Sequence, residues 1–455
     1  MEQNEHPNRG IPSVDRILRD VVDHSLPRPM VLQVIRETLE AIRKCPDIAE
    51  PKAILAQVNA DLESLAASRI QPVINATGVL IHTNLGRVPL ASAALQASTE
   101  LARQYSTLEY DLPNGQRGKR GSYVERCLAE LCGAEAAAVV NNCAAALVLV
   151  LKALMEGERN EIIISRGELI QIGGGFRIPD ILEAAGAQMR EVGTTNKTSL
   201  EDYRRAISGR TALILRVHRS NFVMSGFVES PSRKALAGLA HEAGVPLFED
   251  LGSGALVDTS RWAGLPGESM PRDALGEGID IVCFSGDKLM GGPQAGLIVG
   301  RESFVTKAKK HPFYRAVRCD KMILAALQTV VEAYLGSADP VDEVPLYQML
   351  NRSLESLKQR AEKIVAAWGE RKGQLSIVPH EGKIGGGALP EAQVPSVALN
   401  LKVSGVRPDA LAAQLRAASP PVIGIVEKDA LIFDLRTIFP EQDDTLLNAL
   451  LSLAK

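Results

Sequence analysis

The sequence is poor in aromatic residues and has no long apolar run. Phe, Trp and Tyr make up 4% of its 455 residues. No stretch of about 20 consecutive apolar residues occurs, so the sequence predicts no transmembrane helix. The first residues, Met1 to Pro7, are polar and acidic and lack the apolar core of a secretory signal. We therefore expect a cytoplasmic protein that has no membrane partner.

Cysteine is scarce and net charge is nearly absent. The six cysteines form no CxxC pair, which predicts reduced, packed thiols and neither a disulfide framework nor a metal site. A formal net charge of -3 gives no support to general nucleic-acid binding. The chain is 45% hydrophobic and 23% charged, as expected of a globular protein, and is long enough for two or three domains.

Residues 1–72 are predicted to form a small helical domain. Ser13 precedes an apolar-periodic run, residues 31–42 repeat apolar side chains at helical spacing, and residues 52–67 form a further amphipathic segment. Residues 1–70 hold nine Lys and Arg against eleven Asp and Glu, so no electrostatic grip on nucleic acid is visible. From composition alone, a dimerisation or lid segment fits equally well.

The remaining chain predicts two further domains. Residues 73–330 alternate apolar strands with helices, which is typical of a largely parallel sheet. Residues 331–455 predict a smaller α/β domain, with one long helix over 346–368 and a hairpin around Lys428 and Asp429. The glycine-rich stretch 382–387 is expected to be a mobile loop and receives no role.

Lys288 follows an apolar run, Ile281 to Phe284, and precedes a Gly-Gly-Pro loop. A lysine held at the end of a buried strand is a candidate for forming an imine with a carbonyl group. The alternative is a surface lysine in a hairpin loop. This stretch alone does not separate the two interpretations.

Two other strand ends decide in favour of imine chemistry. Asp250 ends an apolar strand, where it could pair with a protonated pyridine nitrogen or cap a helix. The turn 141–146 opens a helix whose free N–H groups could receive a phosphate. With Ser285 and Lys288, this order predicts a pyridoxal 5′-phosphate (PLP) enzyme of the aspartate-aminotransferase fold, fold type I. The residues expected to bind the cofactor are Lys288, Asp250, Ser285, Asn142, Cys143, Ala144 and His218.

At these residues the chain resembles the bacterial selenocysteine synthases, the L-seryl-tRNA(Sec) selenium transferases. The resemblance covers essentially the whole length. It is carried by long and specific motifs, namely INATGVLIHTNLGR (74–87), YDLPNGQRGKRG (110–121), VVNNCAAALVLVL (139–151), RGELIQIGGGFRIPDI (166–181), RVHRSNF (216–222), FEDLGSGAL (248–256), FSGDKLMGGPQAGLIVG (284–300) and HPFYRAVRCDK (311–321).

The resemblance implies a cytoplasmic ring of dimers, a homodecamer, with active sites at subunit interfaces. It implies that the N-terminal domain holds seryl-tRNA(Sec), that Lys288 carries PLP, and that Asp287 belongs to the active site. Arg87, Arg315 and Arg318 would bind selenophosphate, and guanidinium groups suit such an anion. Arg315 and Arg318 are three residues apart and would share one face if their segment is a helix. Without the resemblance, the sequence indicates only an ordinary solvated basic face there.

The implied reaction converts L-seryl-tRNA(Sec) into L-selenocysteinyl-tRNA(Sec). Lys288 removes the Cα proton, water leaves to give an aminoacrylyl-tRNA, and selenium then adds to Cβ. Asp287 could handle protons on the leaving hydroxyl or in the donor pocket. The alternatives are a PLP-dependent lyase acting on a small amino acid or amino sugar, and a non-catalytic tRNA-binding scaffold. The side chain that stacks on the cofactor ring stays open between His218 and Gln171.

Overall fold

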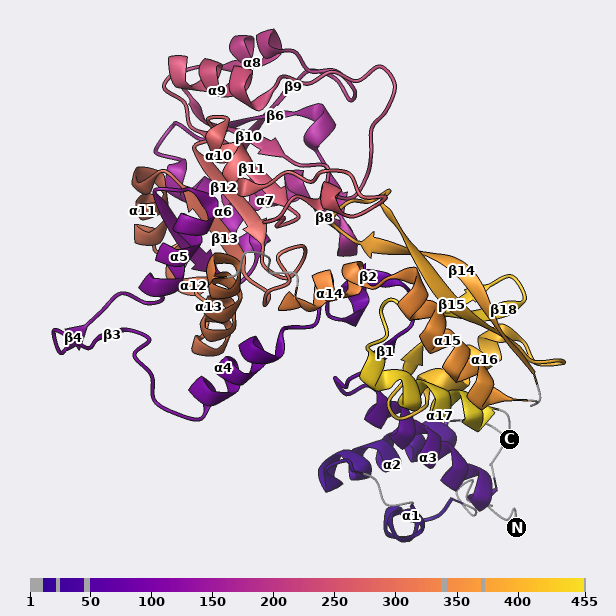
Figure 1. Cartoon of the computed structure of the whole chain (residues 1–455). Coiled ribbons are helices and arrows are strands. Elements are labelled where there is room, and N and C mark those ends of the chain that lie inside the picture. Colours follow the sequence, from indigo (N-terminus) through magenta and orange to yellow (C-terminus); the bar gives the residue numbers. More distant parts are fainter. Residues whose placement is uncertain (1–10, 22–24, 45–49, 337–341, 370–372, 454–455) are drawn as a thin grey trace, which may run out of the picture. The chain divides into compact units, whose positions relative to one another are not determined.

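The computed structural model describes residues 11–21, 25–44, 50–336, 342–369 and 373–453 (Figure 1). The chain divides into two compact units. One comprises residues 1–73 with 413–421, and the other comprises residues 74–412 with 422–455. Among the described residues, no helix is long and apolar enough to cross a membrane.

The first unit contains three helices, α1 (Val14–Asp20), α2 (Arg28–Arg43) and α3 (Pro51–Ala67), as the sequence predicts. The Ser13 hydroxyl accepts a hydrogen bond from the Arg16 amide and caps α1. Apolar side chains at helical spacing meet between the three helices and form a separate core. Its fully enclosed members are Ile17, Val31, Val34, Ile35, Leu39, Ile54, Val58 and Leu62.

The second unit is built on a seven-stranded sheet with the order β5-β13-β12-β11-β10-β6-β9. The strands are β5 (Ala136–Val140), β6 (Glu161–Ser165), β9 (Gln188–Val192), β10 (Thr211–Val217), β11 (Leu247–Gly252), β12 (Ile281–Ser285) and β13 (Gly296–Gly300). Every pairing is parallel except those of β13, which is antiparallel to both β12 and β5. The expected, largely parallel sheet is confirmed.

Both faces of this sheet are covered by helices, because successive side chains along a strand point to opposite faces. In β12, Val282 and Phe284 enter one core, while Ile281 and Cys283 enter the other. One face carries α5 (Ser122–Cys132), α8 (Leu200–Ala206), α9 (Arg233–Glu242), α10 (Pro271–Gly276) and α13 (Lys321–Gly336). The opposite face carries α6 (Cys143–Leu154), α7 (Ile178–Ala185) and α11 (Glu302–Lys310).

A five-stranded sheet in the C-terminal part has the order β17-β18-β15-β14-β2 (Figure 1). Its strands are β2 (Val79–Ile81), β14 (Gln374–Gly385), β15 (Gln393–Lys402), β17 (Ile425–Glu427) and β18 (Ala430–Asp434). The predicted hairpin around Lys428 and Asp429 is confirmed, since β17 and β18 pair antiparallel across it. Strand β2 comes from a distant part of the chain and pairs with the end of β14.

Two local predictions in this part are wrong. Residues 346–368 form two helices, α14 (Pro345–Asn351) and α15 (Leu354–Trp368), because the Ser353 side chain caps a new helix by accepting a hydrogen bond from the Ser356 amide. Much of the stretch 382–387 belongs to β14, which runs to Gly385 in ladder pairing with β15 and β2.

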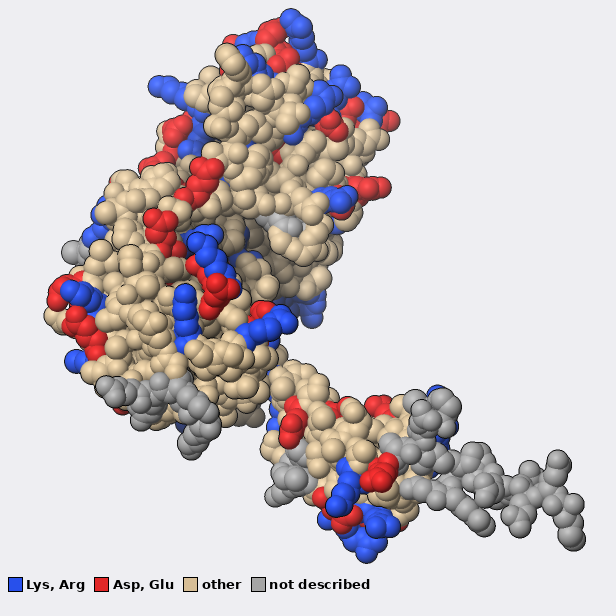
Figure 2. Space-filling view, turned by 90° about the vertical axis from the view of Figure 1, so that its right-hand side faces the viewer, with Lys and Arg blue, Asp and Glu red and all other residues tan. Residues whose placement is uncertain are grey.

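Charged side chains of both signs are interspersed on the face that Figure 2 shows. Over the described residues of that face, Lys and Arg alternate with Asp and Glu and form no broad basic surface. This agrees with the small net charge of the chain, -3.

Candidate active site

The carboxyl ends of the central strands surround a cavity of about 460 Å³. All but two of the residues that the sequence predicts for the site line it. The predicted residues that line the cavity are Arg87, Asn142, Cys143, Ala144, His218, Asp250, Ser285, Asp287 and Lys288. Ligands of open α/β sheets gather at this edge, where several strands end together. Residues from widely separated segments therefore share one concave surface.

Lys288 lies in the turn that follows β12 and is 8% exposed, which excludes the interpretation as a surface hairpin lysine. The turn is held by backbone hydrogen bonds, including Gly286 N–H to Ala295 O at 2.9 Å and Leu289 N–H to Ser253 O at 3.0 Å. Gly387 lies directly against the lysine: a Cβ built at Gly387 would be 2.7 Å from Lys288 Nζ. The amine is thus confined to the cavity by backbone on several sides.

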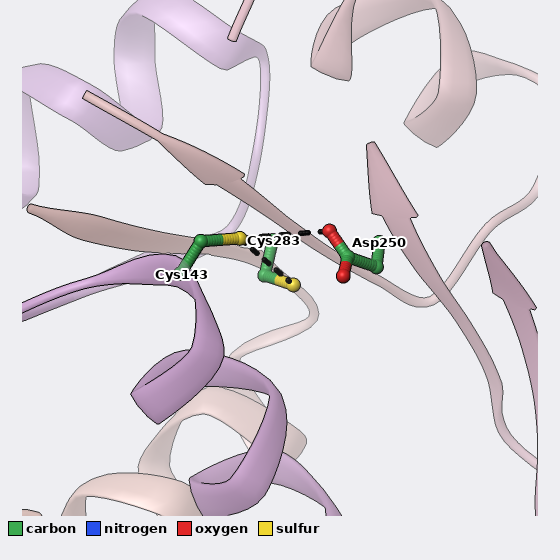
Figure 3. A group of neighbouring side chains, drawn as sticks. All are labelled: Cys143, Asp250 and Cys283. Atoms are coloured by element: carbon green, nitrogen blue, oxygen red, sulfur yellow. Dashed lines mark hydrogen bonds between the residues drawn. The ribbon is translucent and has the colours of Figure 1, made fainter. Parts of the chain in front are cut away.

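Asp250 near the end of β11 supplies a carboxylate to the same cavity. Burial raises its pKa, and the Lys288 ammonium group, the Cys143 and Cys283 thiols and the Gly252 amide act in the opposite direction. Figure 3 shows the carboxylate facing the two thiols, with Cys143 Sγ 3.5 Å from Asp250 Oδ1. An acidic group so enclosed is suited to pairing with a buried cation.

Helix α6 begins at the cavity. The Asn142 side chain caps it by accepting a hydrogen bond of 2.8 Å from the Ala145 amide. Asn142, Cys143 and Ala144 line the cavity, so the first turn of a twelve-residue helix is turned toward it. Free amides and the helix dipole favour an anion at this position.

The Arg87 cation and the Asp287 anion form an ion pair at another wall of the cavity. Arg87 Nε is 3.8 Å from Asp287 Oδ2. Arg87 Nη1 donates to Gly386 O at 3.1 Å and to Thr83 Oγ1 at 3.2 Å. Arg87 itself has a φ of +73°, which is unusual for a residue with a side chain. The guanidinium group is therefore held in a fixed position near Lys288.

Arg315 and Arg318 do not line the cavity of their own chain. Helix α12 (Phe313–Ala316) ends before Arg318, so the two side chains do not share a helical face. The Arg318 backbone forms a bridge with Val140, the last residue of β5, while its side chain pairs with Glu109 at 3.2 Å. The single chain thus brings one of the three predicted arginines to Lys288.

The family model "L-seryl-tRNA selenium transferase" matches residues 73–439, and "Selenocysteine synthase N terminal" matches residues 9–43. The chain belongs to the L-seryl-tRNA selenium transferase family. Two relatives with the name L-seryl-tRNA(Sec) selenium transferase come from Geobacter sulfurreducens and Aquifex aeolicus. They are 42% and 41% identical to this chain, and each alignment covers 98% of both proteins.

A solved structure of D-glucosaminate-6-phosphate ammonia-lyase has a similar fold. Its TM-score is 0.59 at 20% sequence identity, over 86% of this chain and 97% of that chain. At this identity the likeness concerns the fold alone. The predicted α/β fold of the PLP-dependent type I class, with a helical N-terminal unit, is confirmed.

The residues of the cavity fit PLP. Lys288 offers a confined amine, Asp250 a carboxylate for a protonated ring nitrogen, and the start of α6 a set of amides for the phosphate. His218 also lines the cavity, and its buried Nδ1 lies 3.4 Å from Glu268 Oε1.

Several residues at the site were missed by sequence reasoning. Glu268 lies beside His218, with Oε1 3.4 Å from Nδ1, and Gly386 and Gly387 form a wall of the cavity. Glu168 is buried behind the end of β10, where it accepts a hydrogen bond from the Val217 amide. Burial raises the pKa of Glu168 to about 7. Of these residues, only Gly386 and Gly387 gave a signal in the sequence, as part of the glycine-rich stretch 382–387, which was predicted to be a loop without a role.

Proposed function

We propose that this chain converts L-seryl-tRNA(Sec) into L-selenocysteinyl-tRNA(Sec), with PLP as cofactor and selenophosphate as selenium donor. The observation that carries the proposal is the match at 42% identity, over 98% of both chains, to a relative with that activity in its name. The cavity supports it, because Lys288, Asp250 and Arg87 lie around one space. The residue roles given below are part of this proposal.

When bound, PLP supplies an electron sink for the carbon that loses a proton. Lys288 holds the cofactor and then moves the proton at serine Cα, which its confinement between Gly387 and the β12 turn permits. Asp250 holds a proton on the ring nitrogen. Asn142, Cys143 and Ala144 present helix N–H groups to the phosphate, while Ser285 and His218 line the same space.

Arg87 and Asp287 serve different halves of the reaction. Arg87 binds the oxygens of selenophosphate, because its guanidinium is fixed by Thr83 and Gly386 and faces the cavity. Asp287, beside Arg87, takes part in proton transfer to the serine hydroxyl that leaves as water. Selenium then adds at Cβ and phosphate is released.

Arg315 and Arg318 act in a neighbouring copy of the chain in this proposal. The chain has an exposed groove between α4 (Ser92–Ala102), α13 and residues 104–124, where Tyr105, Tyr110, Leu112 and Tyr123 are exposed. Exposed apolar side chains in such number are typical of a surface that packs on another protein. A homodecameric ring of dimers, with sites completed between copies, is the assembly that we propose.

Residues 1–72 hold the tRNA in this proposal, residues 73–330 bind the cofactor, and residues 331–455 form the smaller domain. The family match of residues 9–43 to a selenocysteine synthase N-terminal model supports the first assignment. A cytoplasmic location follows from the proposed substrate, because aminoacyl-tRNA is used by ribosomes in that compartment.

The test is a conversion assay with the full-length chain, PLP, selenophosphate and seryl-tRNA(Sec). We expect selenocysteinyl-tRNA with the wild type and none with Lys288→Ala. Seryl-tRNA(Ser) is the matched control and should not be converted. Release of ammonia from free serine or an amino sugar, without conversion of seryl-tRNA(Sec), would instead identify a small-molecule lyase.

A further inference from the structure

Two thiols from separate elements meet one carboxylate at the wall of the cavity (Figure 3). Cys143 is the first residue of α6, Cys283 lies in β12 and Asp250 lies in β11. Cys143 Sγ is 3.5 Å from Asp250 Oδ1 and 3.9 Å from Cys283 Sγ. Both distances are within the range of hydrogen bonds that involve sulfur. The Asp250 carboxylate therefore lines the cavity and also contacts the Cys143 thiol.

Each thiol has one hydrogen, so Cys143 cannot donate to Asp250 and to Cys283 at once. Burial raises the pKa of the Cys283 thiol well above its ordinary value, and Cys143 and Asp250 add to this effect. Cys283 thus remains a neutral donor. The two contacts of Cys143 use both hydrogens when Cys283 donates to Cys143 and Cys143 donates to Asp250, which forms a relay. Cys283 also acts on the Asp250 carboxylate directly.

The relay counters the effect of burial on Asp250. Burial alone favours the protonated acid, whereas donors to the carboxylate favour the anion. After the Lys288 ammonium group, Cys143 and Cys283 are the strongest influences that lower the pKa of Asp250. Only the ionised form of Asp250 can stabilise a protonated ring nitrogen by its negative charge. The two thiols, which favour the ionised form, therefore support the role proposed for Asp250.

The backbone around Cys143 is fixed. A Cβ at Gly296 in β13 would lie 2.0 Å from Asn142 O and 2.9 Å from Cys143 N, so only glycine permits this close approach. The Asn142 cap fixes the first turn of α6 from the other side. The position of the Cys143 backbone, from which the thiol reaches Asp250, is therefore fixed.

We propose that Cys143 and Cys283 are positioning residues, a thiol relay that keeps Asp250 ionised and aimed at the ring nitrogen of the cofactor. This inference rests on the proposed function, because it takes PLP as the cofactor. It gives the Cys143 side chain a task beyond the backbone contact predicted for that residue. It also gives a task to Cys283, which no prediction from the sequence included.

The test measures the dissociation constant of PLP with full-length apoprotein. Cys143→Ala should raise it about tenfold, since hydrogen bonds to a charged group are worth about that factor or more. Cys143→Ser keeps a donor and should stay within about threefold of the wild type. Cys283→Ala should fall between them, because Cys143 then keeps its contact with Asp250 and loses only its thiol neighbour. Cys127→Ala, a partly buried cysteine in α5, is the matched control and should change nothing.

A second measurement separates positioning from packing. In an Asp250→Asn background, Cys143→Ala should add no further loss of PLP affinity, because the two residues act as one unit. The pH dependence of the visible absorbance of bound PLP should shift in Cys143→Ala and return in Cys143→Ser. Circular dichroism confirms that each variant is folded, and if Cys143→Ala does not fold, Cys143→Ser and Cys283→Ala carry the test.

Four results would overturn the relay. They are wild-type PLP affinity in the cysteine variants, an equal loss from Cys143→Ala in both backgrounds, a loss in folded Cys143→Ser as large as in Cys143→Ala, and one zinc ion per chain in the purified wild type. Zinc is relevant because two thiolates and a carboxylate are zinc ligands. If wild-type protein binds no PLP at all, the proposed function fails. If it binds PLP and the cysteine variants match it, only the relay fails.

Discussion

Gly387 leaves no room for a side chain beside Lys288. A Cβ at Gly387 would lie 2.7 Å from Lys288 Nζ and 3.0 Å from Cε, and the glycine has a φ of +84°. The cover of the reactive amine is therefore backbone, supplied by the loop that follows β14. This contact joins two segments about 100 residues apart in the sequence, and it requires a particular residue at one of them.

Gly387→Ala should reduce catalysis far more than stability. Strain at a positive φ costs about 1 kcal/mol, while the added methyl group displaces the amine from the cavity. We expect a loss of at least about tenfold in kcat/KM, with slower PLP loading. Gly405→Ala is the matched control, because Gly405 has a φ of +77° and nothing within 4 Å of the added Cβ. Equal effects of the two variants would assign the loss to backbone strain alone.

Arg87→Ala should raise the KM for selenophosphate by at least about tenfold, since charge-assisted hydrogen bonds to the anion are lost. PLP binding should change little, because Arg87 lies on the Asp287 side of the cavity. Arg87→Lys should fall between the two, as an ammonium group keeps the charge and loses the fork. Steady-state kinetics with varied selenophosphate measures this, with Arg407→Ala at an exposed site as control. An unchanged KM in Arg87→Ala would remove this arginine from the donor pocket.

Glu168 should make stability depend on pH. Burial raises its pKa from 4.5 to about 7. The proton is thus bound more tightly in the folded chain, and the resulting stabilisation is present below pH 4.5 and is lost as the pH rises through about 7. Relative to Glu168→Gln, the wild type should lose on the order of 3 kcal/mol of unfolding free energy across that range.

Urea unfolding of both proteins between pH 4 and pH 8 measures the difference. Glu191→Gln, at a half-exposed ion pair with Arg166, is a suitable control and should follow the wild type. A wild-type curve parallel to that of Glu168→Gln across this range would show that Glu168 does not titrate there.

Subunit mixing tests whether Arg315 and Arg318 act in a neighbouring copy. Lys288→Ala protein and Arg315→Ala/Arg318→Ala protein should each be inactive. Mixed after mild dissociation and reassembly, they should regain part of the activity, because some cavities then combine an intact Lys288 with intact arginines. Reassembly of each variant alone is the control. Inactive mixtures with full assembly by light scattering would place all these residues in a single chain.

Much of the site could be predicted because it depends on strand ends. Asp250, Ser285 and the Asn142 turn each follow an apolar run, and parallel strands bring their ends to one edge. The local apolar period correctly predicted the helices within residues 14–67. The break at Ser353 was missed, since a polar capping residue within an amphipathic run does not interrupt the apolar spacing of either helix.

The remainder depended on contacts between distant segments. Glycine in the stretch 382–387 is ambiguous in the sequence, because both a loop and a close approach of backbone to another group favour it. Only the fold shows that Gly387 meets Lys288 and that Gly386 O receives Arg87. Glu268 was missed for the same reason: its position beside His218 arises from a loop 50 residues later, which carries no periodic pattern.

Strand β2 has one consequence for how the site can change shape. Val79 and Ile81 pair with Lys383 and Gly385, so the segment that leads to Arg87 and the segment that leads to Gly387 belong to the same sheet. Lys288, in contrast, extends from the seven-stranded sheet. A rotation of the five-stranded sheet would carry Arg87 and the backbone that covers Lys288 together. The position of the proposed anion-binding arginine and the access to Lys288 would then change in the same movement.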